Sequence, residues 1–165
     1  GKEDSIATSQ IDLLVPDRMG LKYVDSDNVE KRPLVIHRAI LGSLERFIGF
    51  YLEKTAGWLP FWLAPEQVRI LTINDTVEDY VEQITTILTD VVLMKPVKYN
   101  EIRYTVDSRN ESLGKKIKEA TEMKIPVQLI VGPKDKEASE VSVRTQEGEQ
   151  KVKLDLLKEF LLNLK

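Results

Sequence analysis

Arg46 is the first residue that could do chemistry, because it follows an apolar run and a Gly-Ser turn at the start of a helical pattern. Residues 33–47 change at Gly42 and Ser43 from a strand-like run to helical spacing. A guanidinium is planar and permanently charged, so in this place it can lie over a phosphate or a nucleobase. The segment therefore predicts a cationic arm over such a ligand, and a helix-surface ion pair is the alternative for Arg46.

His37 is the single histidine of the chain and precedes the same turn. A catalytic zinc takes three protein ligands and keeps one position open, and the chain contains no cysteine. A lone histidine among apolar residues is more often a satisfied core or rim side chain than a metal ligand. By itself, His37 therefore indicates no metal site.

A run of basic residues in the second half of the chain is the other candidate site. It puts five cations within sixteen residues, namely Arg109, Lys115, Lys116, Lys118 and Lys124. The formal net charge of the chain is -3, so nucleic acid could bind only through a local patch of this kind. A solvated helix face is the alternative, because charge runs usually form one.

Composition excludes several classes of protein. The chain has 165 residues, of which 42% are hydrophobic and 31% charged, as in soluble globular proteins. No apolar run approaches the roughly 20 residues that span a bilayer, and no secretory signal opens the chain, so we expect a cytoplasmic protein without a membrane partner. The chain begins with Gly1, as expected of a piece of a longer protein. Serine-hydrolase and nucleotide-loop motifs are lacking, so spacing alone indicates no enzyme class.

Periodicity predicts two parts with a boundary near residue 62, inside an aperiodic segment rich in Trp and Pro at 58–65. The first part, residues 1–62, should hold strands over 6–15, 21–24 and 34–36 and a helix over about 43–54. The second part, residues 63–165, should hold strands over 68–73, 103–107 and 127–131, a further strand around 141–143, and helices over 76–88, 110–124 and 154–164. We expect Thr76 to cap the first of these helices.

This order of elements predicts an α/β fold. The second part should be a mixed β-sheet flanked by helices, and the first an antiparallel β and helix segment. Residues 127–131 are too apolar to have an exposed side, which is typical of a central strand.

Several of these segments resemble the class II aminoacyl-tRNA synthetases. Residues 33–47 resemble motif 3 of that class, and residues 32–43 with 58–65 resemble the threonyl-tRNA synthetase family in particular. Residues 106–117, 125–132 and 140–145 resemble the anticodon-binding domain that the threonyl, prolyl, histidyl and glycyl enzymes share. The resemblance implies the C-terminal portion of a threonyl-tRNA synthetase, with the end of the catalytic domain followed by an anticodon-binding domain.

The resemblance also implies function. The parent would be a cytoplasmic, homodimeric ligase of protein biosynthesis that activates threonine with ATP, using magnesium and zinc, and ligates it to tRNA(Thr). This part would recognise the anticodon loop. Because motifs 1 and 2 are missing from these residues, we expect the chain alone to be inactive, to need no cofactor and to be a monomer.

In the first part, the resemblance assigns three kinds of role. Arg46 corresponds to the motif 3 arginine that stacks on adenine, and is the catalytic and ATP-binding residue. Gln10 and Ser43 match positions of the amino-acid pocket. His37 matches one of three zinc ligands, and it would hold zinc only with a cysteine and a histidine that are absent from this chain.

In the second part, the resemblance assigns the anticodon-binding residues as Arg109, Asn110, Lys115, Lys116, Asp135, Glu137 and Arg144. Arg144 would read a base edge, since arginine forks onto the acceptors of guanine. The family's base-reading glutamate falls on Asp135 in an ungapped match, and Glu137 is the alternative. The lysines and the start of their helix would contact phosphates.

Two other functions stay open. Family members usually begin this region with Gly-Arg-Glu-Trp-Gln, whereas this chain begins with Gly-Lys-Glu-Asp-Ser at residues 1–5. The loss of Trp and Gln supports a non-catalytic, synthetase-like tRNA-binding or regulatory protein. A plain protein-interaction domain is the third possibility, and it predicts no affinity for tRNA.

Overall fold

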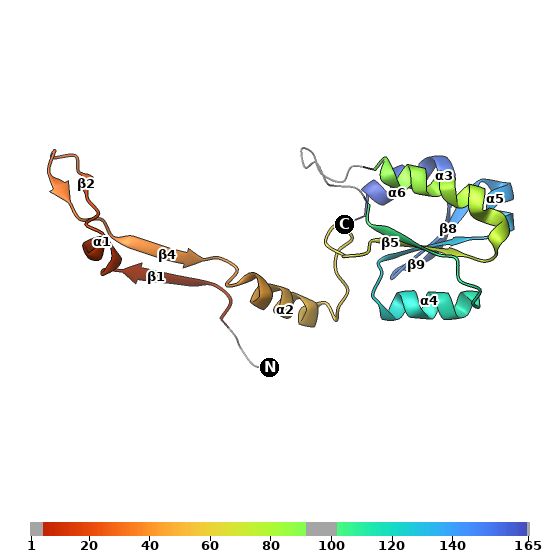
Figure 1. Cartoon of the computed structure of the whole chain (residues 1–165), viewed down its shortest axis with the longest axis horizontal. Coiled ribbons are helices and arrows are strands. Elements are labelled where there is room, and N and C mark those ends of the chain that lie inside the picture. Colours follow the sequence, from red (N-terminus) through yellow and green to blue (C-terminus); the bar gives the residue numbers. More distant parts are fainter. Residues whose placement is uncertain (1–4, 92–101, 165) are drawn as a thin grey trace. The chain divides into compact units, whose positions relative to one another are not determined.

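The computed structural model describes residues 5–91 and 102–164. Their contacts divide the chain into two compact units, Gly1–Lys54 and Thr55–Lys165, which we describe separately (Figure 1). The domain boundary near residue 62 stays a prediction. Residues 1–4 lie outside the described residues, and they include Asp4, which differs from the residue usual in the family.

The unit Gly1–Lys54 is built on an antiparallel pair of strands, which confirms the antiparallel part of the predicted fold. β1 (Thr8–Asp12) pairs with β4 (Val35–Ala39) so that Gln10 lies opposite His37. The other elements are α1 (Val15–Arg18), β2 (Tyr23–Val24), β3 (Glu30–Lys31) and α2 (Leu44–Lys54). β1 is shorter than the expected 6–15, because the Asp12 carboxylate accepts the N–H groups of Leu14 and Val15 at 2.9 Å and turns the chain into α1.

This unit has almost no core of its own. Among its described residues only Pro16 is buried, and large apolar side chains such as Ile40 and Leu44 stay exposed, Ile40 by 70%. A two-stranded sheet without a covered apolar face is marginally stable. Burial within this unit therefore stabilises it little.

The unit Thr55–Lys165 is a five-stranded mixed sheet in the order β6-β5-β7-β8-β9. The strands are β5 (Val68–Thr72), β6 (Tyr104–Asp107), β7 (Val127–Val131), β8 (Glu140–Thr145) and β9 (Gly148–Lys153). β5 is parallel to β6 and β7, and the other pairs are antiparallel. The α/β fold with a mixed sheet is thus confirmed.

Helices cover both faces of this sheet. They are α3 (Glu78–Thr89), α4 (Leu113–Glu122), α5 (Pro133–Ala138) and α6 (Leu157–Leu162), with short 3₁₀ turns η1 (Asp75–Val77) and η2 (Leu154–Leu156). α3 and α6 lie on one face, and α4 lies on the other (Figure 1). β7 is buried along its whole length, as expected of a central strand.

The two faces of the sheet differ in chemistry. The face under α3 and α6 forms the apolar core, whose members include Ile70, Ile84, Leu129, Val143 and Leu157. Successive side chains of a strand point to opposite faces, so the alternate positions Gln128, Ser142 and Arg144 belong to the face on the side of α4. Polar groups that could meet a ligand therefore gather on that second face.

The expected cap at Thr76 is wrong. The Thr76 hydroxyl donates to Asn74 Oδ1 at 2.8 Å inside the turn η1, and α3 begins only at Glu78. The expected helix over 154–164 likewise opens with the turn η2 before α6. The hydroxyl of Thr76 therefore bonds to a nearby side chain instead of capping α3, as the residue types had suggested.

Candidate nucleic-acid interface

The start of α4 is held in place by an ion pair between Arg109 and Asp107. Arg109 Nε donates to Asp107 Oδ1 at 2.9 Å and Nη2 donates to Oδ2 at 2.6 Å, while Nη2 also reaches Glu119 Oε2 at 2.5 Å. The hydrogen bond from Arg109 holds the pKa of Asp107 below its ordinary value. Since 53% of the Arg109 side chain stays exposed, the guanidinium is oriented by protein carboxylates but remains accessible to a ligand.

The helix itself begins with a side-chain cap. The Ser112 hydroxyl accepts the N–H of Lys115 at 3.4 Å, which satisfies one of the unpaired donors at the helix start. Lys115 is exposed and its ammonium donates to Glu111 at 2.6 Å, a hydrogen bond that raises the pKa of the lysine. Asn110 is also exposed. Arg109, Asn110 and Lys115 thus share one accessible surface at the start of α4.

Lys116 lies in the interior instead. Only 2% of it is exposed, and its ammonium donates to the backbone carbonyls of Thr72 at 2.9 Å and Asp107 at 3.1 Å, at the ends of β5 and β6. A phosphate contact would require breaking both bonds and withdrawing the side chain. In this structure Lys116 therefore joins α4 to the sheet, a role that the charge pattern did not suggest.

The two carboxylates predicted as base readers differ in environment. Asp135 is buried; its Oδ2 accepts the N–H of Gly132 at 3.0 Å, and its Oδ1 accepts the Ser142 hydroxyl at 3.3 Å. Glu137 is exposed on the short helix α5. Asp135 therefore caps the start of α5 and contacts Ser142 of β8, whereas Glu137 is exposed to solvent. Which of them contacts RNA stays a prediction.

Arg144 stands on β8 directly opposite Gln128 of β7. It is exposed, and its nearest carboxylate oxygen is on Glu149, 3.6 Å from Nη1. Gln128 and Arg144 also line a pocket of about 330 Å³ together with Trp58 and Thr121. Gln128 and Trp58 were not predicted as site residues; for Gln128, the signal in the sequence was a glutamine within an otherwise apolar central strand.

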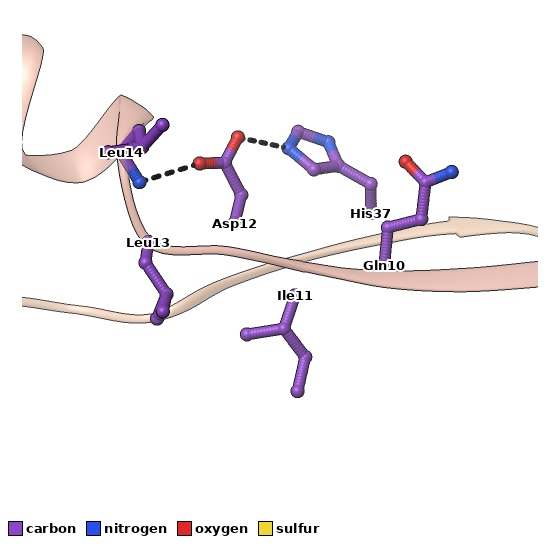
Figure 2. A pocket seen from close by; sticks show the side chains of 6 residues that line it. All are labelled: Gln10, Ile11, Asp12, Leu13, Leu14 and His37. Atoms are coloured by element: carbon purple, nitrogen blue, oxygen red, sulfur yellow. Dashed lines mark hydrogen bonds and ion pairs between the residues drawn. The ribbon is translucent and has the colours of Figure 1, made fainter.

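In the other unit, Gln10 and His37 line a pocket of about 350 Å³ with Asp12 (Figure 2). His37 Nε2 lies 2.9 Å from Asp12 Oδ2. The backbone N–H of Val15 is the main cause of the lowered pKa of Asp12, and the hydrogen bond to His37 is the next. The resemblance placed Gln10 in the amino-acid pocket and made His37 a zinc ligand, and the strand register puts these two residues side by side.

Ser43 and Arg46 meet at the start of α2. The Ser43 hydroxyl accepts the N–H of Arg46 at 3.2 Å, so Ser43 acts as a helix cap here. The Arg46 guanidinium carbon lies 5.8 Å from the centre of the Phe50 ring, close enough for a cation–π contact. Within residues 5–91 and 102–164, no group of three His, Cys, Asp or Glu side chains could hold a metal ion, so a zinc ion bound by His37 would need its other ligands from outside these residues.

Residues 67–164 match the family described as "Anticodon binding domain", which is more than half of the chain. The chain belongs to that family. Residues 1–55 match a second family, "tRNA synthetase class II core domain (G, H, P, S and T)". The polar face beside α4 is therefore a surface of an anticodon-binding domain, joined to a segment of class II synthetase core. Among the described helices of this protein, none has the length and apolar character to cross a membrane.

Curated relatives match almost the whole of this chain. Threonine-tRNA ligases of Staphylococcus aureus strains JH9 and Newman are 41% identical over 165 residues, which is 99% of this chain and 24% of the relative. The chain thus spans about a quarter of the length of these curated relatives.

Solved structures agree in fold. The RNA binding domain of threonyl-tRNA synthetase from Cryptosporidium parvum superposes with a TM-score of 0.77 at 29% identity, covering 96% of this chain and 38% of the other. A putative threonyl-tRNA synthetase from Aeropyrum pernix gives 0.65 at 26% identity, covering 97% and 38%.

Proposed function

We propose that this chain recognises the anticodon loop of tRNA(Thr) through the unit Thr55–Lys165, as a part of a threonyl-tRNA synthetase. The observation that carries the proposal is the accessible Arg109 guanidinium, fixed by Asp107 and Glu119 beside the exposed Asn110 and Lys115. Side chains oriented before binding lose little entropy when RNA arrives. Membership of the anticodon-binding family and the likeness to threonine-tRNA ligases support the choice of RNA.

Within this site the residues divide the work. Arg109, Asn110 and Lys115 position the sugar-phosphate backbone, because contacts to phosphates fix register without reading sequence. Arg144 reads a base edge of a splayed, single-stranded loop, the form in which RNA sequence is usually recognised. Asp135 or Glu137 supplies the carboxylate that reads a second base. Lys116 supports the site from inside.

The parent would activate threonine with ATP and transfer it to tRNA(Thr) in the cytoplasm, as a homodimer. In the parent enzyme, Arg46 would stack on adenine beside magnesium-bound phosphates. Gln10 and Ser43 would line the amino-acid pocket. His37 would contribute one ligand to a zinc ion whose other ligands come from other residues. The capped α2 and the His37–Asp12 contact support these placements. The chain alone should be a monomer and aminoacylate nothing, since residues 5–54 lack a packed core that could preorganise an active site.

Titrating this chain with two tRNAs tests the proposal. One carries a threonine anticodon, and the other has the same body with an unrelated anticodon. We expect at least tenfold tighter binding of the first at the same salt concentration. Equal affinity for both would reject anticodon recognition, and no binding of either would favour the protein-interaction function.

A non-catalytic tRNA-binding protein is the second candidate, because Asp4 and Ser5 replace the Trp and Gln usual in the family. The sequence that precedes Gly1 in the gene separates the two. An intact motif 2 with a cysteine and a histidine supports the enzyme, and the loss of these residues supports the non-catalytic protein.

A further inference from the structure

The thioether of Met123 contacts a guanidinium at the C-terminal end of α4. Met123 directly follows α4, and its Sδ lies 3.4 Å from both Nη1 and Nη2 of Arg69, which belongs to β5. Met123 is nevertheless 64% exposed. A small oxidant in the solvent can therefore approach a side chain whose sulfur already touches a fixed cation.

The guanidinium of Arg69 is held from its other edge. Its Nε donates to Glu66 Oε1 at 2.7 Å and its Nη2 to Glu66 Oε2 at 2.6 Å. Glu66 is itself fixed by the hydroxyl of Thr105, which donates to Oε1. Only 11% of the Arg69 side chain is exposed. The guanidinium therefore keeps its orientation, and its outer edge directs one N–H from each Nη toward the sulfur.

The donors and the acceptor of this contact are poorly matched. A thioether sulfur is a weak acceptor, whereas the N–H groups of a guanidinium bond most strongly to oxygen. A sulfoxide oxygen carries a partial negative charge and is a much better acceptor. Methionine has three rotatable bonds, and Met123 is exposed, so a sulfoxide oxygen can turn toward Arg69 without displacing packed side chains.

We propose that Met123 is a reversible oxidation site, and that Arg69 binds its sulfoxide oxygen and thereby fastens the end of α4 to β5. Hydrogen peroxide is the oxidant: a sulfur lone pair attacks one peroxide oxygen, the O–O bond breaks, and the departing hydroxide takes the proton of the transferred oxygen. Sulfur is oxidised by two electrons and the peroxide leaves as water. Sulfoxide reductases reverse the step. This modification is independent of RNA binding.

The effect on stability has an unusual sign. A sulfoxide formed inside an apolar core disrupts the packing, because a polar group replaces an apolar one. At Met123 the oxygen meets two N–H groups and solvent instead. Oxidation should therefore stabilise the unit Thr55–Lys165.

Two variants with a single methionine each test the proposal. The chain has three methionines, Met19, Met94 and Met123. The double variant Met19→Leu, Met94→Leu retains only Met123. The double variant Met94→Leu, Met123→Leu retains only Met19, which is 69% exposed and belongs to the other unit, so it is the matched control. A third protein adds Arg69→Lys to the first variant, because lysine keeps the charge but has no fork of N–H groups.

Each protein is treated with hydrogen peroxide until mass spectrometry shows one added oxygen, and peptide mapping locates that oxygen. Urea unfolding is then followed by tryptophan fluorescence. Both tryptophans, Trp58 and Trp62, belong to the unit Thr55–Lys165, so the signal reports the unfolding of that unit. Each oxidised protein is compared with its own reduced form, and a change in basal stability caused by a substitution does not enter the comparison.

We expect oxidation to raise the urea midpoint of the Met123 protein by about 0.3–0.6 M, and to move the midpoint by less than about 0.1 M in the Met19 control and in the Arg69→Lys protein. An unchanged or lower midpoint in the oxidised Met123 protein would overturn the proposal, as would an equal rise in the Arg69→Lys protein or a failure of Met123 to take up oxygen. If Arg69→Lys does not fold, the contrast between the Met123 and Met19 proteins decides.

Discussion

Arg109 donates two parallel hydrogen bonds to the carboxylate of Asp107, at 2.9 and 2.6 Å. Such two-pronged pairs fix orientation as well as distance. Asp107 ends β6 and is buried, whereas Arg109 begins the loop that leads into α4 and is half exposed. The pair therefore ties the orientation of Arg109, the group that we propose contacts RNA, to the sheet, so the proposed RNA binding should depend on the charge of a buried carboxylate.

The stability of the protein should depend on the charge of Asp107. Its pKa is lowered in the folded state by Arg109, so its contribution is fully present above the unfolded pKa of about 4 and is lost as the pH falls through the folded pKa. We expect Asp107→Asn to reduce the free energy of unfolding by about 1–3 kcal/mol at pH 7. Urea unfolding at pH 7, 4 and 3 should show this difference shrinking in acid.

The exposed Asp155, at the start of η2, offers the control for that experiment. Asp155→Asn should change the free energy of unfolding little at any of the three pH values. A deficit in Asp107→Asn that stays constant from pH 7 to pH 3 would contradict the ion-pair explanation.

Substitutions of the adjacent lysines Lys115 and Lys116 should differ strongly in their effect on stability. Lys116→Met removes two hydrogen bonds to buried carbonyls, and we expect it to lower the free energy of unfolding by about 2–4 kcal/mol. Lys115→Met breaks only an exposed pair with Glu111, which should leave the free energy of unfolding nearly unchanged because solvent screens such pairs. Chemical denaturation of both variants measures the contrast, and equal stabilities would show that the interior bonds of Lys116 do not hold α4 to the sheet.

Lys115 should act on RNA affinity rather than on folding. Lys115→Ala is expected to weaken binding of every tRNA evenly and to reduce the slope of log K against log salt concentration by about 0.7–1, the value for one lost phosphate contact. Titrations at several salt concentrations give this slope. Lys158→Ala, on α6 over the other face of the sheet, should leave it unchanged. A slope for Lys115→Ala equal to that of the wild type would exclude the phosphate contact.

Arg144 should govern preference among anticodons. Removing its guanidinium in Arg144→Ala should reduce the preference for a threonine anticodon by about 1–3 kcal/mol, because a base-edge contact discriminates by that amount. Glu149→Gln removes only the weak ion pair of Arg144 and should keep the preference. Competition binding of cognate and non-cognate tRNA measures both variants. If Arg144→Ala weakened the two tRNAs equally, Arg144 would be a phosphate contact and no base reader.

Elements with strong periodicity could be predicted from the sequence. The apolar run 127–131 is the buried central strand β7, and the helical spacing after Ser43 is α2. β9 and α5 could not be recognised: β9 is largely exposed and charged, without alternation, and α5 has only six residues. Lys115 and Lys116 were predicted to have the same role because both are cations. On the helix, however, Lys115 points to solvent and Lys116 points toward the backbone carbonyls at the ends of β5 and β6.

The pocket of Gln128 shows a second limit of sequence patterns. Its walls come from Trp58, α4, β7 and β8, so its lining residues Trp58, Gln128 and Arg144 are far apart in the chain. Only the pairing of β7 with β8 brings Gln128 opposite Arg144. A pattern within one segment cannot reveal such a combination, so the residue types could suggest Arg144 but not its partner.

Protein footprinting tests the central claim most directly. The chain is exposed to hydroxyl radicals with and without an anticodon stem-loop RNA that carries a threonine anticodon, and the modified residues are located by mass spectrometry. We predict protection at Arg109–Lys115 and around Arg144, and none on the outer face of α3. An unchanged pattern at the start of α4 and on β8, under conditions in which the RNA is bound, would contradict anticodon recognition by this surface.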